Sequence, residues 1–231
     1  MKDDAYETPG WAVHRLLEKL QLPRGGTWLE PCAGSGNIIR AVQEVYREHW
    51  GAVEIRKECQ ADLEQLGVKP FIEDFLAIDP KSLLHFQVLL TNPPYSLAQQ
   101  YIERGLEIAD HVVVLLRLNF LASEERQAFL STHTPDIYVL PNRPSFVQAV
   151  SCTNQIHPAA CPYQVFFKPS VEVPHACPLC GEPVKITSSD SAEYAWFHFW
   201  GKSLFGVTPR ERGHVEILNT TPLAVRRAKT A

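Results

Sequence analysis

The feature of this sequence that most constrains its fold is a regular alternation of short apolar runs and amphipathic segments through the first 146 residues. The apolar runs have the length of strands, and the segments between them have the spacing of helices. We expect strands over 27–34, 51–55, 69–75, 86–91, 111–116 and 136–140, and helices over 37–49, 58–67, 96–110 and 123–133. This series predicts an α/β fold with a mostly parallel sheet and helices on both faces, with ligands bound beyond the carboxyl ends of the strands.

The alternation stops at 142–146. From 147 to 190 the chain is rich in proline, serine, cysteine and histidine and has little periodicity. Strand-like patterns return in an aromatic run at 193–200 and in a shorter run at 214–219. We therefore predict one α/β domain, formed by 1–146 and 191–231, with a Cys-rich insert over 147–190.

Composition and charge narrow the class of protein. The hydrophobic fraction of 45% can supply a proper core, and the longest apolar runs are too short to cross a bilayer. The first residues lack the apolar core of a signal peptide, so we expect a soluble, cytoplasmic protein with no membrane partner. A net charge of −4 weakly disfavours purely electrostatic binding of nucleic acid. The basic residues beyond 201 fit either a solvated terminus or a patch that contacts phosphates.

Three carboxylates stand at the ends of three successive predicted strands. Glu30 opens a glycine-rich turn, where a carboxylate would repel a pyrophosphate but suit an ammonium group. Glu54 comes 18 residues after Gly36, close to the offset of about 20 at which an acid takes ribose hydroxyls. Asp74, followed by Phe75, could accept from an adenine amino group. Together they predict a site for a cationic adenosine compound, and the alternative is three ordinary exposed acids.

A rigid turn, Asn92-Pro93-Pro94-Tyr95, follows the predicted strand at 86–91. Proline cannot donate to a sheet ladder, so the two prolines stop a core strand and place an amide beside an aromatic ring. The turn is the last of five motifs that occur in the order seen in amino-methyltransferases that use S-adenosylmethionine: Thr8-Pro9, LEPCAGSG at 29–36, Glu54, EDF at 73–75 and NPPY at 92–95. The sequence resembles the gamma arrangement of adenine-N6 DNA methyltransferases from Tyr6 to Phe146 and again at the aromatic strand.

The resemblance implies a Rossmann-like class I methyltransferase fold with a seven-stranded sheet, S-adenosylmethionine as cofactor and DNA as partner. It assigns catalysis to the turn Asn92, Pro93, Pro94 and Tyr95. It assigns cofactor binding to Thr8, Pro9, Glu30, Pro31, Cys32, Ala33, Gly34, Gly36, Glu54, Ile55, Asp74, Phe75 and Asn92.

The chemistry of an exocyclic base amine explains why such a turn is needed. The lone pair of this nitrogen is delocalised into the ring, which makes it a poor nucleophile. The side-chain carbonyl of Asn92 and the backbone carbonyl of Pro93 can accept its two hydrogens and direct the lone pair at the methyl group, while Tyr95 stacks on the base. We expect a direct in-line displacement with no covalent enzyme intermediate and no metal.

Two further residues are candidates for acceptor binding. A base within a duplex must leave the stack and lie between aromatic faces, and Phe146 stands where the family often places the second aromatic wall. A simple core phenylalanine is the alternative. Arg143 is interpreted equally well as a phosphate contact or as a member of a surface ion pair.

Four of the six cysteines lie in the insert, which in an intracellular chain suggests a metal before disulfides. Cys177 and Cys180 form a knuckle pattern that can grip one structural zinc ion, and Cys152 and Cys161 are the expected remaining ligands. His157 and His175 are possible substitutes for a cysteine. Free or redox-active thiols are the alternative, although a redox motif would normally open a helix.

The chain departs from the family in lacking a sizeable recognition domain after the catalytic one. The departure suggests short sequence recognition, a partner subunit or a non-duplex acceptor, and a zinc-stapled insert is a candidate substitute reader of nucleic acid. The same turn also suits adenine in RNA and the planar amide of a protein glutamine. An inactive cofactor-binding or zinc-binding subunit is the alternative outside enzymes.

Overall fold

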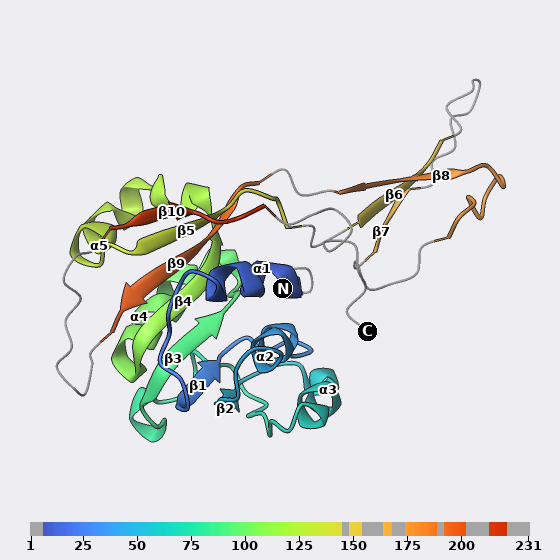
Figure 1. Cartoon of the computed structure of the whole chain (residues 1–231). Helices are drawn as coiled ribbons and strands as arrows, with labels where there is room; N and C mark the ends of the chain where they lie inside the picture. The colour runs from blue at the N-terminus through green and yellow to red at the C-terminus, as the bar shows by residue number, and fades with distance from the viewer. Residues whose placement is uncertain are drawn as a thin grey trace.

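The computed structural model describes residues 7–144, 148–153, 164–167, 174–188, 192–201 and 213–220. A large sheet has the order β10-β5-β9-β4-β3-β1-β2, and a small sheet has the order β7-β6-β8. The strands of the large sheet are β1 (Thr27–Glu30), β2 (His49–Ala52), β3 (Phe86–Thr91), β4 (Ala109–Arg117), β5 (Asp136–Leu140), β9 (Tyr194–Trp200) and β10 (Val215–Ile217). The strands of the small sheet are β6 (Gln148–Cys152), β7 (Gln164–Phe167) and β8 (Val184–Ser188). In Figure 1 the small sheet projects away from the large one.

Of the described α-helices, α1 precedes β1 along the chain, and the others connect strands of the large sheet. The α-helices are α1 (Gly10–Leu17), α2 (Asn37–Gln43), α3 (Gln60–Gln65), α4 (Ala98–Ile108) and α5 (Gln127–Thr132). Single 3₁₀ turns are η1 (Lys57–Cys59), η2 (Pro80–Ser82), η3 (Tyr95–Leu97), η4 (Leu118–Leu121) and η5 (Glu124–Arg126). Among the described helices, none combines the length and the apolar character that crossing a membrane requires.

The large sheet is mostly parallel, as predicted. β1 pairs in parallel with β2 on one side and with β3 on the other, and β3 pairs in parallel with β4. Of the seven described strands in this sheet, β9 alone runs antiparallel to its neighbours, β4 and β5. The aromatic run that follows the insert therefore returns to the centre of the sheet.

Both faces of the large sheet are covered, which explains the continuous apolar character of β4. Val113 and Leu115 pack in one buried cluster with residues of α1 and α2, whereas Val112 and Val114 pack in a second cluster with residues of α4. Successive side chains of a strand point to opposite faces, so a strand that is covered twice needs apolar residues at every position.

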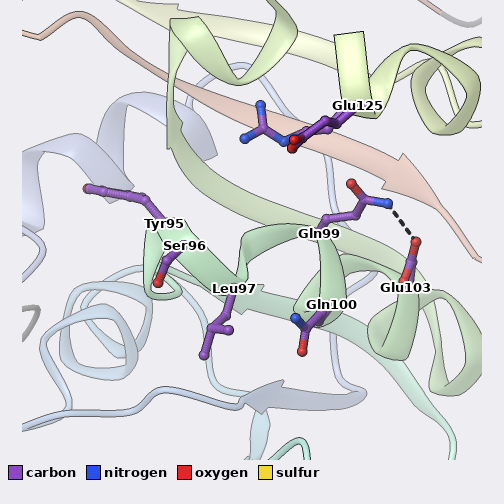
Figure 2. Close-up of a pocket in the computed structure, with 8 residues that line it drawn as sticks. Tyr95, Ser96, Leu97, Gln99, Gln100, Glu103 and Glu125 are labelled. Carbon is purple, nitrogen blue, oxygen red and sulfur yellow. Dashed lines mark hydrogen bonds between the residues drawn. The ribbon is translucent and has the colours of Figure 1, made fainter. Parts of the chain in front are cut away.

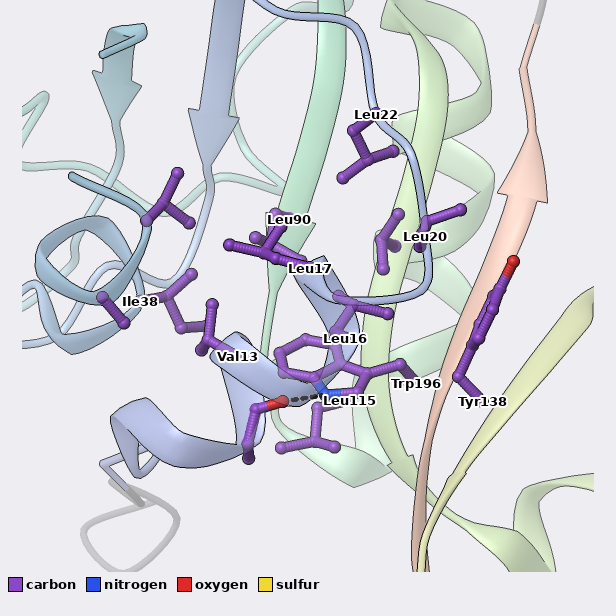
Figure 3. Packing of buried hydrophobic residues seen from close by; sticks show 14 of the residues in the cluster. Val13, Leu16, Leu17, Leu20, Leu22, Ile38, Leu90, Leu115, Tyr138 and Trp196 are labelled. Atoms are coloured by element: carbon purple, nitrogen blue, oxygen red, sulfur yellow. Dashed lines mark hydrogen bonds between the residues drawn. The ribbon is translucent and has the colours of Figure 1, made fainter. Parts of the chain in front are cut away.

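The N-terminal helix α1 is fastened to the first face by packing and by one buried hydrogen bond. Figure 3 shows Val13 and Leu16 of α1 beside Leu115 and Trp196. The indole nitrogen of Trp196 donates to the backbone carbonyl of Ala12 at 2.9 Å. Residues from the two ends of the sequence thus meet in one core.

Three local predictions were wrong. The segment 69–75 forms no named strand but a single bridge between Val53 and Phe71, so Asp74 does not end a strand. The sheet nevertheless has seven strands because β10 pairs with β5. The helix expected over 37–49 ends at Gln43, where the amides of Val45 and Tyr46 both turn back to the Val42 carbonyl.

The third local error concerns the helix expected over 123–133. Ser123 precedes η5, as a capping residue would, but its side chain makes no capping hydrogen bond. The segment 124–132 is split between a 3₁₀ turn and the short helix α5.

Candidate active site

The candidate site lies where β1 and β3 run side by side, with their carboxyl ends at the same edge of the large sheet. The chain leaves β1 for β2 on one side and later enters β3 on the other side. Such a reversal is a topological switch point, and in open parallel sheets it borders a ligand-binding crevice. Glu30 ends β1 and Asn92 follows β3, so the structure brings the two predicted motifs together.

Cys32 connects the glycine turn with the Asn-Pro-Pro-Tyr turn. Its thiol is buried beside Tyr101 of α4 and Thr91, the last residue of β3. Burial raises the pKa of this thiol to about 12, so Cys32 stays uncharged near neutral pH. The thiol is therefore a neutral contact between the two turns rather than a nucleophile.

The turn after β1 depends on glycine. Gly34 and Gly36 have φ angles of 54° and 82°, in the left-handed region that glycine adopts without steric cost. A Cβ atom at Gly36 would lie 2.5 Å from Cδ1 of Leu66, so a side chain there would also displace its neighbour. The turn is closed by a hydrogen bond from the Gly36 amide to the Ala33 carbonyl at 2.8 Å.

Glu30 is a buried carboxyl group with spare hydrogen-bonding capacity. It is 2% exposed, and burial raises its pKa well above the usual value. One of its oxygens, Oε2, has no hydrogen-bond partner among the described residues. A buried carboxyl with an unused oxygen is costly unless a ligand satisfies it, and contact of Glu30 with an ammonium group stays a prediction.

Glu54 is held by the glycine turn and by Arg56. Its oxygens accept from the Gly34 amide at 2.6 Å, from the Arg56 amide at 2.9 Å and from Arg56 Nε at 2.8 Å. Burial alone would raise the pKa of Glu54, but the hydrogen bonds from Arg56 outweigh it and hold the pKa below its usual value. The carboxylate is therefore charged and anchored beside Gly34. The neighbouring side chain of Ile55 is 66% exposed.

The third predicted acid, Asp74, lies in a turn, where its Oδ1 accepts from the Leu76 amide at 2.9 Å. Phe75 is 1% exposed and packs on Tyr101, with 5.3 Å between the ring centroids. Because Tyr101 also lies beside Cys32, the Phe75 ring belongs to the packed layer beneath the crevice. A cofactor contact by Asp74 or Phe75 stays a prediction.

The Thr8-Pro9 segment reaches the glycine turn through a residue that the sequence analysis missed. Glu7 accepts from the Ser35 hydroxyl at 3.1 Å and from the Asn37 side-chain amide at 3.5 Å. Thr8 is buried, and Pro9 immediately precedes α1. The position of Glu7 directly before the Thr-Pro pair was the available signal.

The Asn-Pro-Pro-Tyr turn leads from β3 into η3. The Pro94 carbonyl accepts from the Leu97 amide at 2.9 Å, so the turn itself uses this oxygen. Asn92 is half-buried and Pro93 is buried. The Tyr95 ring lies beside Tyr194, 5.9 Å between centroids, and under the guanidinium of Arg117, whose carbon is 5.1 Å from the ring centroid. Sequence reasoning missed Arg117 and Tyr194 because neither belongs to a local motif with Tyr95.

Two shallow pockets adjoin Tyr95. One, of about 280 Å³, lies between α4 and η5 (Figure 2), and the other, of about 240 Å³, extends toward the end of β4. Both are lined by Tyr95, Ser96 and Arg126. The surface next to the Tyr95 ring is therefore hollowed on the side away from β1.

The two remaining candidates for acceptor binding are Arg143 and Phe146. Arg143 makes an ion pair with Glu193, and both side chains are more than half exposed. This contact is the surface pairing that the sequence left open beside a phosphate contact. Phe146 lies outside the described residues, so its proposed role as a second aromatic wall stays a prediction.

Three of the four predicted metal ligands converge. The sulfur atoms of Cys152, Cys177 and Cys180 lie within 4.8 Å of one another, and the Leu179 amide donates to the Cys177 sulfur at 3.4 Å. The turn between the paired cysteines closes with Gly181 at a φ of 77°. Cys161 and His157 lie outside the described residues, and the exposed His175 is not part of the cluster.

Comparisons with known proteins bear on the fold. No protein-family model matches the sequence, and no curated protein is similar to it. Among solved structures, the type I restriction-modification methyltransferase subunit from Streptococcus thermophilus has a TM-score of 0.56 at 12% identity, covering 88% of this chain and 46% of that one. A modification subunit of a candidate type I restriction enzyme from Vibrio vulnificus has a TM-score of 0.51 at 14% identity, covering 84% and 44%.

A candidate RNA methyltransferase from Pyrococcus horikoshii is similar over a larger share of its own length. The TM-score is 0.51 at 16% identity, and the match covers 85% of this chain and 86% of that one. With the sheet order and the switch point, these likenesses define the fold as the Rossmann-like fold of class I S-adenosylmethionine-dependent methyltransferases.

Proposed function

We propose that this protein transfers a methyl group from S-adenosylmethionine to the exocyclic N6 of adenine in DNA. The observation that carries the proposal is the position of the Asn92–Tyr95 turn at the switch point, opposite the glycine turn and Glu30. Two of the similar structures are methyltransferase or modification subunits of type I restriction systems, which supports DNA as the acceptor. The similar RNA methyltransferase makes RNA the second candidate.

The residues around the glycine turn suit this cofactor, which supplies an electrophilic methyl group when bound. The unused oxygen of Glu30 matches the ammonium group of the methionine portion, and a buried ion pair would satisfy the one oxygen that has no partner among the described residues. Glu54, charged and anchored beside Gly34, is placed to accept ribose hydroxyls after Arg56 gives up its hydrogen bonds. Gly34 and Gly36 let the backbone approach the ligand closely.

The Asn-Pro-Pro-Tyr turn would receive the acceptor base. The Asn92 side-chain oxygen and the Pro93 carbonyl accept the two hydrogens of the amine and orient its lone pair toward the methyl group. The Pro94 carbonyl already accepts from Leu97, which leaves these two oxygens as the pair for the task. Tyr95 stacks on the base, which must first leave a duplex stack. Holding the reactants in line supplies most of the acceleration.

The proposal is tested by incubating the purified protein with methyl-labelled cofactor and unmethylated single-stranded or double-stranded DNA. We expect label in N6-methyldeoxyadenosine, identified by nucleoside mass spectrometry. Asn92→Ala should lower the rate about 100-fold, because it removes one oriented dipole at the reacting nitrogen. Its affinity for S-adenosylhomocysteine should stay within about threefold of wild type, since the carbonyl contacts the acceptor.

The matched control is Asn219→Ala, which removes an exposed asparagine after β10 and should leave the rate unchanged. Parallel reactions contain transfer RNA, structural RNA and a glutamine-containing protein substrate. Absence of label from every DNA would remove the proposal, and label confined to RNA or protein would assign the same chemistry to that acceptor.

We also propose that the insert over 147–190 forms a separate unit, stapled by a structural zinc ion, that contacts nucleic acid. Cys152, Cys177 and Cys180 supply three ligands, and Cys161 is the proposed fourth. Thiolate ligands alone make a closed tetrahedral site, the form typical of structural zinc. The sulfur atoms of Cys152 and Cys180 are 3.4 Å apart, too far for a disulfide bond of about 2.05 Å.

Metal analysis tests the zinc site. Protein purified without chelator should contain about one zinc per chain. Cys177→Ser should lose it, whereas Cys59→Ser, at a cysteine in η1 remote from the cluster, should keep it. Retention of zinc by Cys177→Ser, or wild-type protein without zinc after supplementation, would contradict the assignment.

A further inference from the structure

The 240 Å³ pocket beside Tyr95 has a positive lining that the proposed chemistry does not use. Its polar side chains are Ser96, Arg117, Asn119 and Arg126, and none of the described residues that line it carries a carboxylate. We call it the arginine pocket. Two guanidinium groups, a hydroxyl and an amide around a small hollow are the donors that an oxyanion needs.

Each arginine makes a hydrogen bond and a ring contact that orient its guanidinium group. Arg117, at the end of β4, donates from Nε to the Tyr194 hydroxyl at 3.1 Å, and its guanidinium also covers the Tyr95 ring. Arg126 donates from Nη1 to the Phe120 carbonyl at 3.0 Å, with its guanidinium carbon 4.6 Å from the centroid of that ring. These contacts orient the guanidinium groups, so an anion in the pocket would meet prepositioned donors.

The acidic groups near Tyr95 line the adjoining pocket, which shares Tyr95, Ser96 and Arg126 with the arginine pocket. Glu103 and Glu125 line the adjoining 280 Å³ pocket, where Glu103 accepts from Gln99 at 2.9 Å. An anion that reaches this surface is therefore attracted toward the arginine pocket and repelled by its neighbour. A nucleic-acid strand that passes Tyr95 is therefore expected to place its phosphates toward the arginine pocket.

We infer that the arginine pocket binds a backbone phosphate of the DNA strand that carries the acceptor base. The inference rests on the proposed function, because it takes Tyr95 as the surface on which that base stacks. Phosphate and base belong to one nucleotide or to adjacent ones, and the pocket shares the Tyr95 ring with the turn. Arginine is the residue best suited to grip a phosphate through paired donors. A glutamine side chain of a protein acceptor carries no such anion, so the pocket favours a nucleotide polymer.

The variant Arg126→Gln tests the inference, since Arg126 lines the pocket without touching Tyr95 in a stacking contact. Fluorescence anisotropy gives the affinity for a labelled single-stranded DNA that contains one adenine, at several salt concentrations. Removing one phosphate contact should reduce the slope of log affinity against log salt by about 0.7. The affinity at low salt should fall about tenfold. Arg126→Lys keeps the charge and should restore most of the slope.

The matched control is Arg24→Gln, which removes an exposed arginine that stacks on Tyr46 ahead of β1. Its salt slope should equal that of wild type, and calorimetric binding of S-adenosylhomocysteine should be the same in all variants. The same measurements on an RNA of equal sequence form the second arm.

An Arg126→Gln slope equal to that of wild type with DNA would overturn the inference, as would a change seen with RNA alone. Wild-type protein that binds S-adenosylhomocysteine but no oligonucleotide would overturn it while leaving the cofactor part of the proposed function standing. Wild-type protein that shows the expected slopes but no affinity for S-adenosylhomocysteine would contradict the proposed function and support the phosphate site.

Discussion

A buried imidazole predicts how the stability of this protein depends on pH. His198 of β9 is 1% exposed and stacks on His111, whose Nδ1 atom lies 3.0 Å from Nε2 of His198. Burial, and next the nearby His111, lower the pKa of His198 from 6.5 to about 3. The perturbation is His198→Leu, which keeps a similar volume and removes the titrating group.

The direction and size of the pH effect on stability follow from the difference in proton binding between the folded and the unfolded chain. Between pH 3 and 6.5 the unfolded chain binds a proton at His198 that the folded chain does not, so the free energy of unfolding falls as the pH is lowered. The fall approaches 1.36 kcal/mol per pH unit below 6.5, which amounts to about 2 kcal/mol between pH 8 and pH 5. For a chain of this length, that loss lowers Tm by about 4–8 °C.

The assay is urea unfolding, followed by tryptophan fluorescence, of wild type and His198→Leu at half-unit steps from pH 8 to pH 5. The variant loses packing at every pH, but its stability should decline by about 2 kcal/mol less than that of wild type over this range. Burial also lowers the pKa of His111, but His111 is present in both proteins. His49→Leu, which removes an exposed imidazole of β2, is the control and should follow wild type.

The carboxylate of Asp136 opposes the effect of burial on the pKa of His198. Oδ2 of Asp136 lies 4.0 Å from Nδ1 of His198, and a carboxylate there favours the imidazolium. Burial should outweigh it, because Asp136 directs its other oxygen to the His214 amide at 2.9 Å and makes no hydrogen bond to the imidazole. Equal pH slopes for wild type and His198→Leu, or a steeper slope for the variant, would refute this reasoning.

Three further predictions follow from single contacts. Arg56→Ala removes the guanidinium from the oxygens of Glu54 and keeps the backbone donors, so S-adenosylhomocysteine should bind about threefold to tenfold more tightly by calorimetry; weaker binding would show that Arg56 helps to hold the ligand. Trp196→Phe leaves the buried Ala12 carbonyl without its donor and should cost about 1–3 kcal/mol in urea unfolding, and an unchanged midpoint would exclude a role for this bond. Gly36→Ala forces a side chain into the left-handed region and should cost about 1–3 kcal/mol by thermal melting, with cofactor affinity reduced as well.

The sequence alone determined the elements that bear on the chemistry. The strand predicted over 86–91 is β3, with the same limits. An uninterrupted apolar run indicates a strand that is buried on both faces, and the side chains of β3 do face helices on both sides. The turn that follows β3 was predictable from its two prolines, because proline restricts the φ angle of its own backbone. The glycines at 34 and 36 likewise reveal a positive φ without knowledge of their neighbours. The fold class followed from the alternation of these elements.

What the sequence missed depends on partners that lie far along the chain. The segment 69–75 has a strand-like pattern but forms one bridge, although the shorter strand-like run at 214–219 does form an edge strand by pairing with β5. Arg117 and Tyr194 meet around Tyr95 only because β4 and β9 are adjacent. The presence of Arg56 near Glu54 is evident from the sequence, but its hydrogen bonds to Glu54 are not, because a side-chain contact depends on the rotamers of both residues.

There is a physical reason why some features were predictable from the sequence and others were not. Local backbone preferences and hydrophobic periodicity act within a few residues, so they determined β3, the glycine turn after β1 and the Asn92–Tyr95 turn. Charge pairing, burial and pocket shape are set by groups that only the packed chain brings together. The tertiary structure alone therefore decided the arginine pocket beside Tyr95, the unused oxygen of Glu30 and the uncharged imidazole of His198.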